Sequence, residues 1–268
     1  MNEATLRRTA LAWLAAARPA VVVQVLEAQG STPREAGARM LVSADAVEGT
    51  IGGGHLELQA IADARAALAA GTARQLHEKR YALGPALGQC CGGAVTLRRT
   101  PLDGDSLARW PEPLARFHLQ LYGAGHVGRA IVRVLAGIDC RVSWIDERDA
   151  EFPVRSELPP HIECVCVDKV QAEVAGAPAG AFYLVLTHSH AVDLAIVEAV
   201  LRRGDFGFLG LIGSATKRAR FEHRLQERGV TEAQLQRLVC PIGLPGITGK
   251  EPEVIAVGVV AQLLQWSS

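Results

Sequence analysis

The sequence predicts an α/β protein with a Rossmann-like parallel sheet in its C-terminal part and a smaller α+β domain before it. Two observations support this fold class. An apolar strand beginning at Phe117 runs into Gly-Ala-Gly-His-Val-Gly at residues 123–128, which is a G-x-G-x-x-G pattern at the start of a helix. Beyond it, apolar strand-like runs alternate with helical stretches, as expected for a parallel sheet with helices on both faces.

Residues 1–100 are predicted to form the N-terminal domain. Apolar residues at helical spacing before residue 18 predict an amphipathic first helix. Arg7 and Arg8 ahead of an apolar stretch also have some likeness to an export signal, but Arg18 and Pro19 interrupt that stretch early and favour the helix. Strands are then expected at residues 20–26, 40–42, 75–83 and 94–97, with a helix at residues 56–70.

Residues 101–116 are predicted to link the two domains, because Pro101, Pro111 and Pro113 fall in a stretch with little periodicity. The Rossmann-like domain is expected over residues 117–268. After the glycine-rich turn, strands are expected at residues 140–145, 163–167, 181–186, 206–212 and 240–243. Helices are expected at residues 171–174, 192–203, 213–228 and 251–265, and from residue 231 onward.

The glycine-rich turn predicts a phosphate-binding site of mononucleotide type. Gly123 lets the chain turn out of the strand, Gly125 lets a phosphate approach the backbone, and Gly128 lets the helix pack on the strand. The helix begins near His126, and its N-terminus offers unpaired N–H groups to an anion. Asp146 ends the next apolar run about 20 residues further on, where a carboxylate typically binds a ribose hydroxyl.

A second anion contact is predicted where a later strand meets its helix. Gly213 and Ser214 follow an apolar run, and Lys217 and Arg218 lie in the first turn of the helix after it. Lys217 and Arg218 are equally typical of a solvated helix face. Because ligands bind at the carboxyl ends of strands in such sheets, this segment is expected to meet the glycine-rich turn in one crevice.

His188 and His190 are expected at the same edge of the sheet. Alternate residues of an extended segment point the same way, so these two histidines with Asp193 have a spacing that a metal ion would accept. Asp193 also falls in the first turn of a helix, where a carboxylate offsets the helix dipole. The favoured interpretation is a polar lining of the crevice.

A second glycine-rich segment occurs in the N-terminal domain. Gly52, Gly53 and Gly54 precede a helix that opens with His55 and carries Glu57 in its first turn. Successive backbone N–H groups in such a loop can converge on an anion. The alternative is a tight strand-to-helix turn without a ligand. Three consecutive glycines are entropically costly, which favours a binding role.

Two adjacent cysteines, Cys90 and Cys91, lie in a glycine-flanked loop, where a thiol can be accessible. They are candidates for a soft metal or sulfur ligand or for a nucleophile, and inert loop thiols are the alternative. The other cysteines are expected to be reduced, as in a cytoplasmic protein. Among them, Cys140, Cys164 and Cys166 lie in or beside apolar runs and are expected to be buried.

The composition restricts the classes of partner. Apolar residues make up 49% of the 268 residues, which predicts a globular protein. Lys plus Arg equals Asp plus Glu at 28 each, so no bulk positive field attracts nucleic acid or anionic lipid. No apolar run reaches the length of a membrane span. Neither a nucleic-acid partner nor a membrane is therefore expected.

Taken together in their order and spacing, the motifs resemble those of the XdhC/CoxI family, the accessory proteins that mature xanthine dehydrogenase and related molybdenum hydroxylases. The resemblance covers nearly the whole chain. It rests on residues 30–34, 49–57, 90–93, 123–128, 187–193, 212–221, 241–244 and 253–257. Residues 248–253 depart from the family's usual T-P-E-E-I-A helix start.

The resemblance implies a carrier protein rather than a conventional enzyme. It implies transient binding of the molybdenum cofactor, a molybdopterin, which is protected while a cysteine desulfurase replaces an oxo ligand with sulfur. Delivery to apo-xanthine dehydrogenase or a related hydroxylase follows, and a homodimer is expected. The glycine-rich segments would bind the phosphate, and Cys90 or Cys91 would contact the metal or its sulfur.

Two other functions stay open. The G-x-G-x-x-G turn with Asp146 is also typical of an NAD(P)-dependent oxidoreductase, and the turn would then hold NAD(P) or another nucleotide. Alternatively, the protein is a nucleotide-binding scaffold that assembles partners without touching the cofactor.

Overall fold

The computed structural model describes residues 2–83, 93–111 and 114–267. The chain forms two compact units, Met1–Pro113 and Leu114–Ser268. Cys90 and Cys91 lie outside the described residues, so the predictions for these two thiols stay predictions. Both glycine-rich segments and the other predicted site residues fall within the described parts.

The N-terminal unit is built on an antiparallel sheet with the strand order β3-β2-β1-β5-β4. Its strands are β1 (Ala20–Gln29), β2 (Arg39–Ser43), β3 (Val47–Gly49), β4 (His77–Ala82) and β5 (Ala94–Pro101). Strand β1 is central because its first residues are almost continuously apolar and buried on both faces. The short β3 was not predicted.

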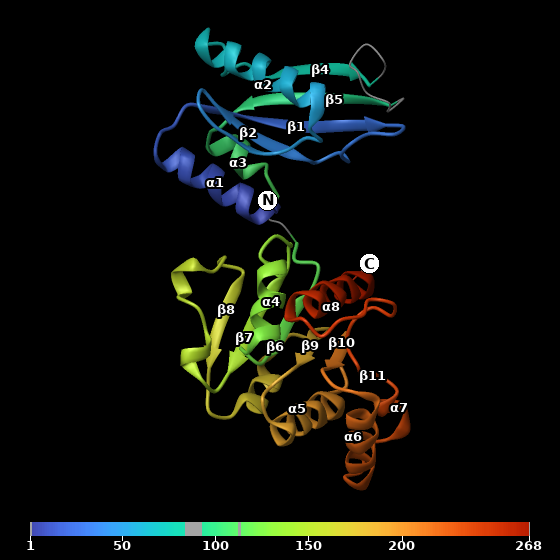
Figure 1. Ribbon diagram of the computed structural model, residues 1–268. Coiled ribbons are helices and arrows are strands. Elements are labelled where there is room, and N and C mark those ends of the chain that lie inside the picture. Colours follow the sequence, from blue (N-terminus) through green and yellow to red (C-terminus); the bar gives the residue numbers. More distant parts are fainter. Residues whose placement is uncertain (1, 84–92, 112–113, 268) are drawn as a thin grey trace. The chain divides into compact units, whose positions relative to one another are not determined.

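Helices cover both faces of this sheet (Figure 1). The helix α2 (Gly54–Ala69) packs with Leu56, Ala60 and Ala64 on one face. On the other face, α1 (Glu3–Ala15) packs with α3 (Gly104–Ala108). The described part of this unit is therefore an α+β sandwich with two apolar cores.

Residues 101–111 of the segment that was predicted as a linker belong to the N-terminal unit. Strand β5 continues to Pro101, and Asp103 then caps α3 through a capping box with Ser106. Leu107 and Trp110 are buried against α1. These apolar contacts pack residues 102–110 against α1.

The C-terminal unit contains a parallel sheet with the strand order β11-β10-β9-β6-β7-β8. Its strands are β6 (His118–Tyr122), β7 (Arg141–Asp146), β8 (Ile162–Cys166), β9 (Phe182–Val185), β10 (Phe208–Leu211) and β11 (Leu238–Val239). The predicted parallel, Rossmann-like sheet is confirmed. The last strand lies at residues 238–239, just before the predicted 240–243.

Helices cover both faces of this sheet as well (Figure 1). The helices α4 (His126–Leu135) and α8 (Pro252–Trp266) pack on one face. The opposite face is covered by α5 (His190–Arg203), α6 (Ala215–Glu227), α7 (Glu232–Leu235) and the 3-10 helix η4 (Val170–Gly176). Short 3-10 turns, η2 (Asp149–Glu151) and η3 (Arg155–Glu157), follow β7. No helix in the described parts is long and apolar enough to cross a bilayer.

Candidate functional site at the carboxyl edge of the parallel sheet

The strand order reverses its direction between β6 and β9. Counted in chain order within the unit, the six strands have the order 3-2-1-4-5-6. After β6 the chain goes to α4 on one face, and after β9 it goes to α5 on the other. The two connections therefore diverge, and open α/β sheets bind ligands at such a switch point.

The glycine-rich turn leaves β6 with tight packing at two glycines and open space at the third. Gly123 has φ +117°, and a Cβ there would lie 2.4 Å from the Leu186 carbonyl oxygen. A Cβ on Gly128 would lie 2.1 Å from the Gly123 carbonyl oxygen. At Gly125, the N-cap of α4, no heavy atom of the described residues lies within 4 Å of an added Cβ. The geometry is that of a phosphate-binding turn.

Asp146 is buried beside this turn and is fully hydrogen-bonded. Its Oδ2 accepts from the Ala124 N–H at 2.7 Å and from Arg148 Nη2 at 3.0 Å. Its Oδ1 accepts from the Arg148 N–H at 3.0 Å and from Arg148 Nε at 2.9 Å. A carboxylate has about four acceptor positions, and these are filled. A ribose hydroxyl would have to displace Arg148, so the ribose role of Asp146 stays a prediction.

Burial alone would raise the pKa of Asp146. The hydrogen bonds from Arg148 and from the N–H groups of Ala124 and Arg148 outweigh burial and hold this pKa below its ordinary value. Asp146 is therefore a carboxylate at neutral pH. In the described structure it fixes the backbone of the glycine-rich turn.

A buried ion pair joins the loops that follow β9 and β10. Lys217 Nζ lies 2.6 Å from Asp193 Oδ2 and donates to the Ile212 carbonyl oxygen at 2.9 Å. Asp193 Oδ1 accepts from the Thr187 hydroxyl at 2.7 Å and from the Thr187 N–H at 3.0 Å. Gly213 gives the Lys217 side chain room, since a Cβ there would lie 2.6 Å from Lys217 Cδ.

The Asp193–Lys217 ion pair, through its bonds to Thr187 and Ile212, therefore connects the loops that follow β9 and β10. The Lys217 charge, predicted as an anion contact, is neutralised by Asp193, whose side chain is fully buried. Arg218 bonds Glu222 on its own helix at 2.7 Å and the Cys240 carbonyl oxygen at 3.4 Å. Within the described parts of the chain, no cluster of His, Cys, Asp and Glu is arranged to hold a metal ion.

A hollow of about 500 Å³ lies beside this ion pair, in the C-terminal unit. It is lined by Thr187, His188, His190, Ile212, Gly213, Ser214, Thr216, Lys217, Arg220, Phe221 and Arg224. Five predicted site residues thus line one hollow: His188, His190, Gly213, Ser214 and Lys217. Arg218 was predicted with them but does not line it. Arg220 and Arg224 were not predicted, although Thr216, Arg220 and Arg224 follow one another at intervals of four residues, which indicates a shared helix face.

His188 also reaches the neighbouring loop beyond β7. Its Nε2 lies 3.4 Å from Glu147 Oε1. Glu147 follows β7 and His188 follows β9, and these strands flank β6. The pair therefore spans the carboxyl end of β6, beside a small hollow that Asp146 and Val192 help to line. His126 is exposed at the first position of α4.

The N-terminal glycine loop is already occupied by a carboxylate of its own chain. Glu57 Oε2 accepts from the Ile51 N–H at 2.9 Å, from the Gly53 N–H at 3.1 Å and from the Thr50 hydroxyl at 2.5 Å. Gly52, Gly53 and Gly54 all have positive φ, which allows the loop to converge in this way. Of the glycine N–H groups that were predicted to bind a ligand anion, that of Gly53 thus binds Glu57 and that of Gly52 donates to the Thr50 hydroxyl at 3.1 Å. His55 is exposed and lies 3.2 Å from Gln59.

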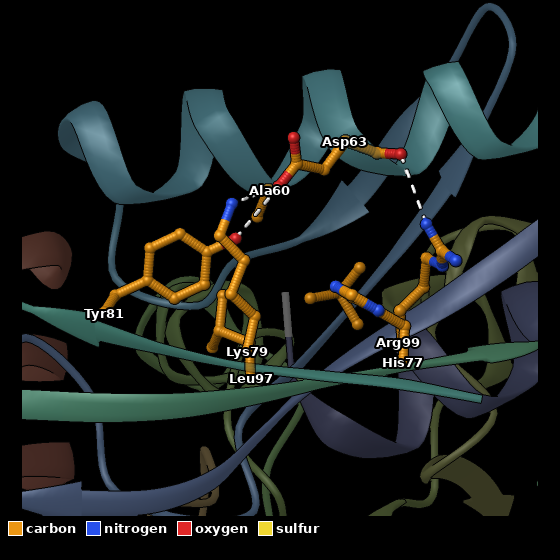
Figure 2. Close-up of a pocket in the computed structure, with 8 residues that line it drawn as sticks. Ala60, Asp63, His77, Lys79, Tyr81, Leu97 and Arg99 are labelled. Carbon is orange, nitrogen blue, oxygen red and sulfur yellow. Dashed lines mark hydrogen bonds and ion pairs between the residues drawn. The ribbon is translucent and has the colours of Figure 1, made fainter.

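A charged cluster in the same unit was not predicted (Figure 2). Asp63 of α2 accepts from Lys79 Nζ at 3.0 Å and from the Tyr81 hydroxyl at 3.1 Å, and Arg99 donates to the Asp63 carbonyl oxygen at 3.3 Å. Burial alone would raise the pKa of Asp63, but the hydrogen bonds from Lys79 and Tyr81 outweigh burial and lower this pKa. The bonds join α2 to β4 and β5. The hollow beside the cluster has a volume of only about 20 Å³, which is too small for an organic ligand.

The cysteines within the described parts are free thiols. Cys140 is buried as predicted, and Cys240 is buried as well. Cys164 is half-buried, and the prediction that Cys166 is buried is wrong, because its side chain is exposed. Burial raises the pKa of Cys140 to about 12, so this thiol is protonated and unreactive at neutral pH.

The strand order, the glycine-rich turn and the loops at the carboxyl edge define a Rossmann-type class of domain. The model of the XdhC Rossmann domain matches residues 119–263, and that of the XdhC and CoxI family matches residues 13–80. The chain belongs to the XdhC and CoxI family, which confirms the resemblance drawn from its motifs.

Two known proteins illustrate the similarity. YqeB, an uncharacterized protein of Escherichia coli strain K12, is 33% identical over 261 residues, which cover 92% of this chain and 43% of YqeB. The chain thus spans less than half the length of this curated relative. A crystal structure described as a xanthine dehydrogenase from Bacillus halodurans has a TM-score of 0.78 at 20% identity, covering 99% of this chain and 96% of that one. At that identity the likeness shows the fold.

Proposed function

We propose that the protein takes part in the maturation of xanthine dehydrogenase or a related molybdenum hydroxylase, as a transient carrier of the molybdenum cofactor. The observation that supports this most directly is family membership, with matches in both units. The apo-hydroxylase is then the partner that receives the cofactor.

The residues at the carboxyl edge fit a cofactor that carries a phosphate. The space over Gly125 is open, and the N-terminus of α4 begins directly after it. The neighbouring hollow is lined by His188, His190 and Ser214, which offer polar contacts. When bound, the cofactor supplies molybdenum redox chemistry. The chain's own residues would bind its phosphate, orient it and exclude water.

The N-terminal glycine loop supplies no equivalent cradle for a phosphate. Its converging N–H groups are taken by Glu57, so a ligand anion would have to displace a carboxylate of the same chain. We therefore assign the phosphate to the carboxyl edge of the C-terminal unit. We propose that Cys90 and Cys91 bind the metal or its sulfur, and that a cysteine desulfurase supplies this sulfur.

The carrier function is tested by loading the protein in a cell. The full chain is co-expressed with the enzymes of cofactor biosynthesis and purified, and released pterin is oxidised and measured by its fluorescence. We expect bound pterin, and loss of hydroxylase activity in a strain that lacks the protein. Absence of pterin together with normal hydroxylase activity would overturn the proposal.

The role of the two adjacent thiols is tested separately. Replacing both Cys90 and Cys91 by serine is expected to abolish maturation of the hydroxylase, if these thiols handle the metal or its sulfur. A scaffold that only assembles partners would keep full maturation activity. Light scattering of the purified protein tests the proposed homodimer.

A nicotinamide dinucleotide is the second candidate ligand. The strand order 3-2-1-4-5-6 is shared with dinucleotide-binding folds and favours it. The filled acceptor positions of Asp146 oppose it, because no oxygen is left for the ribose. Titration with NADH and NADP separates the two candidates: tight binding with turnover of a small carbonyl compound would support the oxidoreductase.

A further inference from the structure

We propose that Arg220 and Arg224 form the binding site for a terminal phosphate or diphosphate of a small phosphorylated molecule. The site is the hollow of about 500 Å³ that lies between the loops following β9 and β10. The proposal deepens the carrier function and partly rests on it, because it places the phosphate of that cofactor in this hollow rather than over Gly125. The anion-binding step itself can be measured without the cofactor.

The lining of the hollow has an unbalanced charge. His188, His190, Lys217, Arg220 and Arg224 all face it, and the described lining contains no Asp or Glu. The chain as a whole carries equal numbers of acidic and basic residues, 28 of each. The basic lining is thus a local concentration of charge rather than a reflection of composition, and a charged hollow focuses the field on a small anion.

Most of the free charge belongs to the two arginines. Arg220 and Arg224 are exposed, and neither has a carboxylate within ion-pair distance among the described residues. Other charged residues of α6 are paired: Arg218 with Glu222 at 2.7 Å and His223 with Glu227 at 3.5 Å. The guanidinium groups of Arg220 and Arg224 are therefore the side chains of α6 that bring unpaired positive charge to the hollow.

The spacing of the two arginines suits a phosphate. Residues four apart on a helix lie about 5–6 Å apart at Cβ, so both planar forks can reach neighbouring phosphate oxygens. Arginine binds phosphate in a bidentate manner, which lysine cannot do. Lys217 is held by Asp193 beneath them, so it fixes the wall of the hollow and adds little net charge.

Two helix N-termini reinforce the site. The helix α5 begins at His190 after its N-cap Ser189, and α6 begins at Ala215 after its N-cap Ser214. Both starts adjoin the hollow, since His190 and Ser214 line it. The positive ends of the two helix dipoles therefore favour an anion at the end of the hollow near His190 and Ser214, while the arginines lie further along α6.

The size and walls of the hollow favour a small molecule over a polymer. About 500 Å³ lies in the range of small-molecule sites, roughly 300–1,000 Å³. Ile212 and the ring of Phe221 contribute apolar wall, which suits the body of an organic phosphate. The zero net charge of the chain argues against a long polyanion.

The experiment measures binding of inorganic pyrophosphate and of ADP to the full chain by calorimetry. Wild-type protein is compared with R220Q/R224Q and with the charge-matched control R133Q/R155Q. Arg133 and Arg155 are 67% and 64% exposed and each has one surface ion pair, so their loss is expected to change little. Circular dichroism and thermal melting check that each variant is folded.

We expect R220Q/R224Q to bind pyrophosphate at least about tenfold more weakly per arginine removed, since hydrogen bonds between charged groups are strong. The control should bind as wild type, and R224K should keep part of the affinity. Equal binding by R220Q/R224Q, or no phosphate binding by wild type, would overturn the proposal. Tighter binding of a single-stranded oligonucleotide than of pyrophosphate would also overturn it.

Pterin loading separates this proposal from the carrier function. If wild type binds pyrophosphate through the arginines but carries no pterin in the co-expression experiment, the carrier function fails and the anion site stands. If R220Q/R224Q loses pyrophosphate binding and also loads less pterin, the hollow is supported as the phosphate site of the cofactor. If this variant loads pterin as fully as wild type, the assignment of the cofactor's phosphate to the arginines is wrong.

Discussion

Replacing Lys217 with methionine is expected to destabilise the C-terminal unit strongly. The side chain of Asp193 is fully buried, that of Lys217 is 12% exposed, and their charged atoms are 2.6 Å apart. Removing one partner of such a pair leaves a buried, uncompensated charge, which costs about 3–5 kcal/mol. For a unit of this size that corresponds to a fall in melting temperature of roughly 10 °C.

Hydrogen exchange followed by mass spectrometry measures this effect within one unit. Peptides from β9 and β10 are expected to open more easily by about 3–5 kcal/mol in K217M, while peptides from β1 in the other unit serve as an internal reference. The control variant Arg133→Met removes an exposed pair with Glu253 and is expected to change stability by less than about 1 kcal/mol.

The double variant D193N/K217M decides the physical cause. Asparagine keeps an oxygen for the Thr187 hydroxyl and N–H, and no charge is left unpaired. Its cost is therefore expected to be smaller than that of K217M by about 2 kcal/mol or more. If K217M loses less than about 1 kcal/mol, or if the double variant is as unstable as the single one, the ion pair is not what holds these loops.

Three further outcomes are expected. Gly128→Ala should unfold or strongly destabilise the C-terminal unit in thermal melts, because its Cβ would lie 2.1 Å from a backbone oxygen, whereas Gly125→Ala should melt as wild type. Asp146→Asn should cost about 2 kcal/mol at neutral pH. Because the folded pKa of Asp146 is lowered, its contribution should be complete above about pH 4 and vanish as the pH falls through the folded pKa, so melts of wild type and variant should converge in acid. Glu57→Ala should cost about 1–3 kcal/mol in urea unfolding of the N-terminal unit, since it orphans the N–H groups of Ile51 and Gly53.

The parts of the fold that depend on local sequence were predicted well. The steric needs of Gly123 and Gly128 arise within one turn, so the pattern of glycines is enough to place the strand, the turn and the helix. The alternation of apolar runs likewise predicts the parallel sheet. By contrast, α3 was missed because it has only five residues, although Asp103 and Ser106 at capping-box spacing were a usable signal.

The charged residues of the site were harder to predict, because their roles depend on partners that are distant in the sequence. Lys217 lies at the predicted edge, but its charge is taken by Asp193, 24 residues earlier. Arg218 and Arg220 differ by two positions in α6, yet only Arg220 faces the hollow. That difference depends on the rotational phase of α6 against the sheet, which the residue types do not reveal.

The carboxylate of Glu57 has a consequence for the energetics of binding in the N-terminal unit. Glu57 binds the N–H groups of Ile51 and Gly53, and Thr50 binds that of Gly52, so this part of the loop is held in place before any ligand arrives. A partner that meets this loop therefore encounters a rigid, preorganised surface and incurs little entropy loss there on binding. Any ordering that accompanies docking on this unit is expected to arise outside residues 50–54.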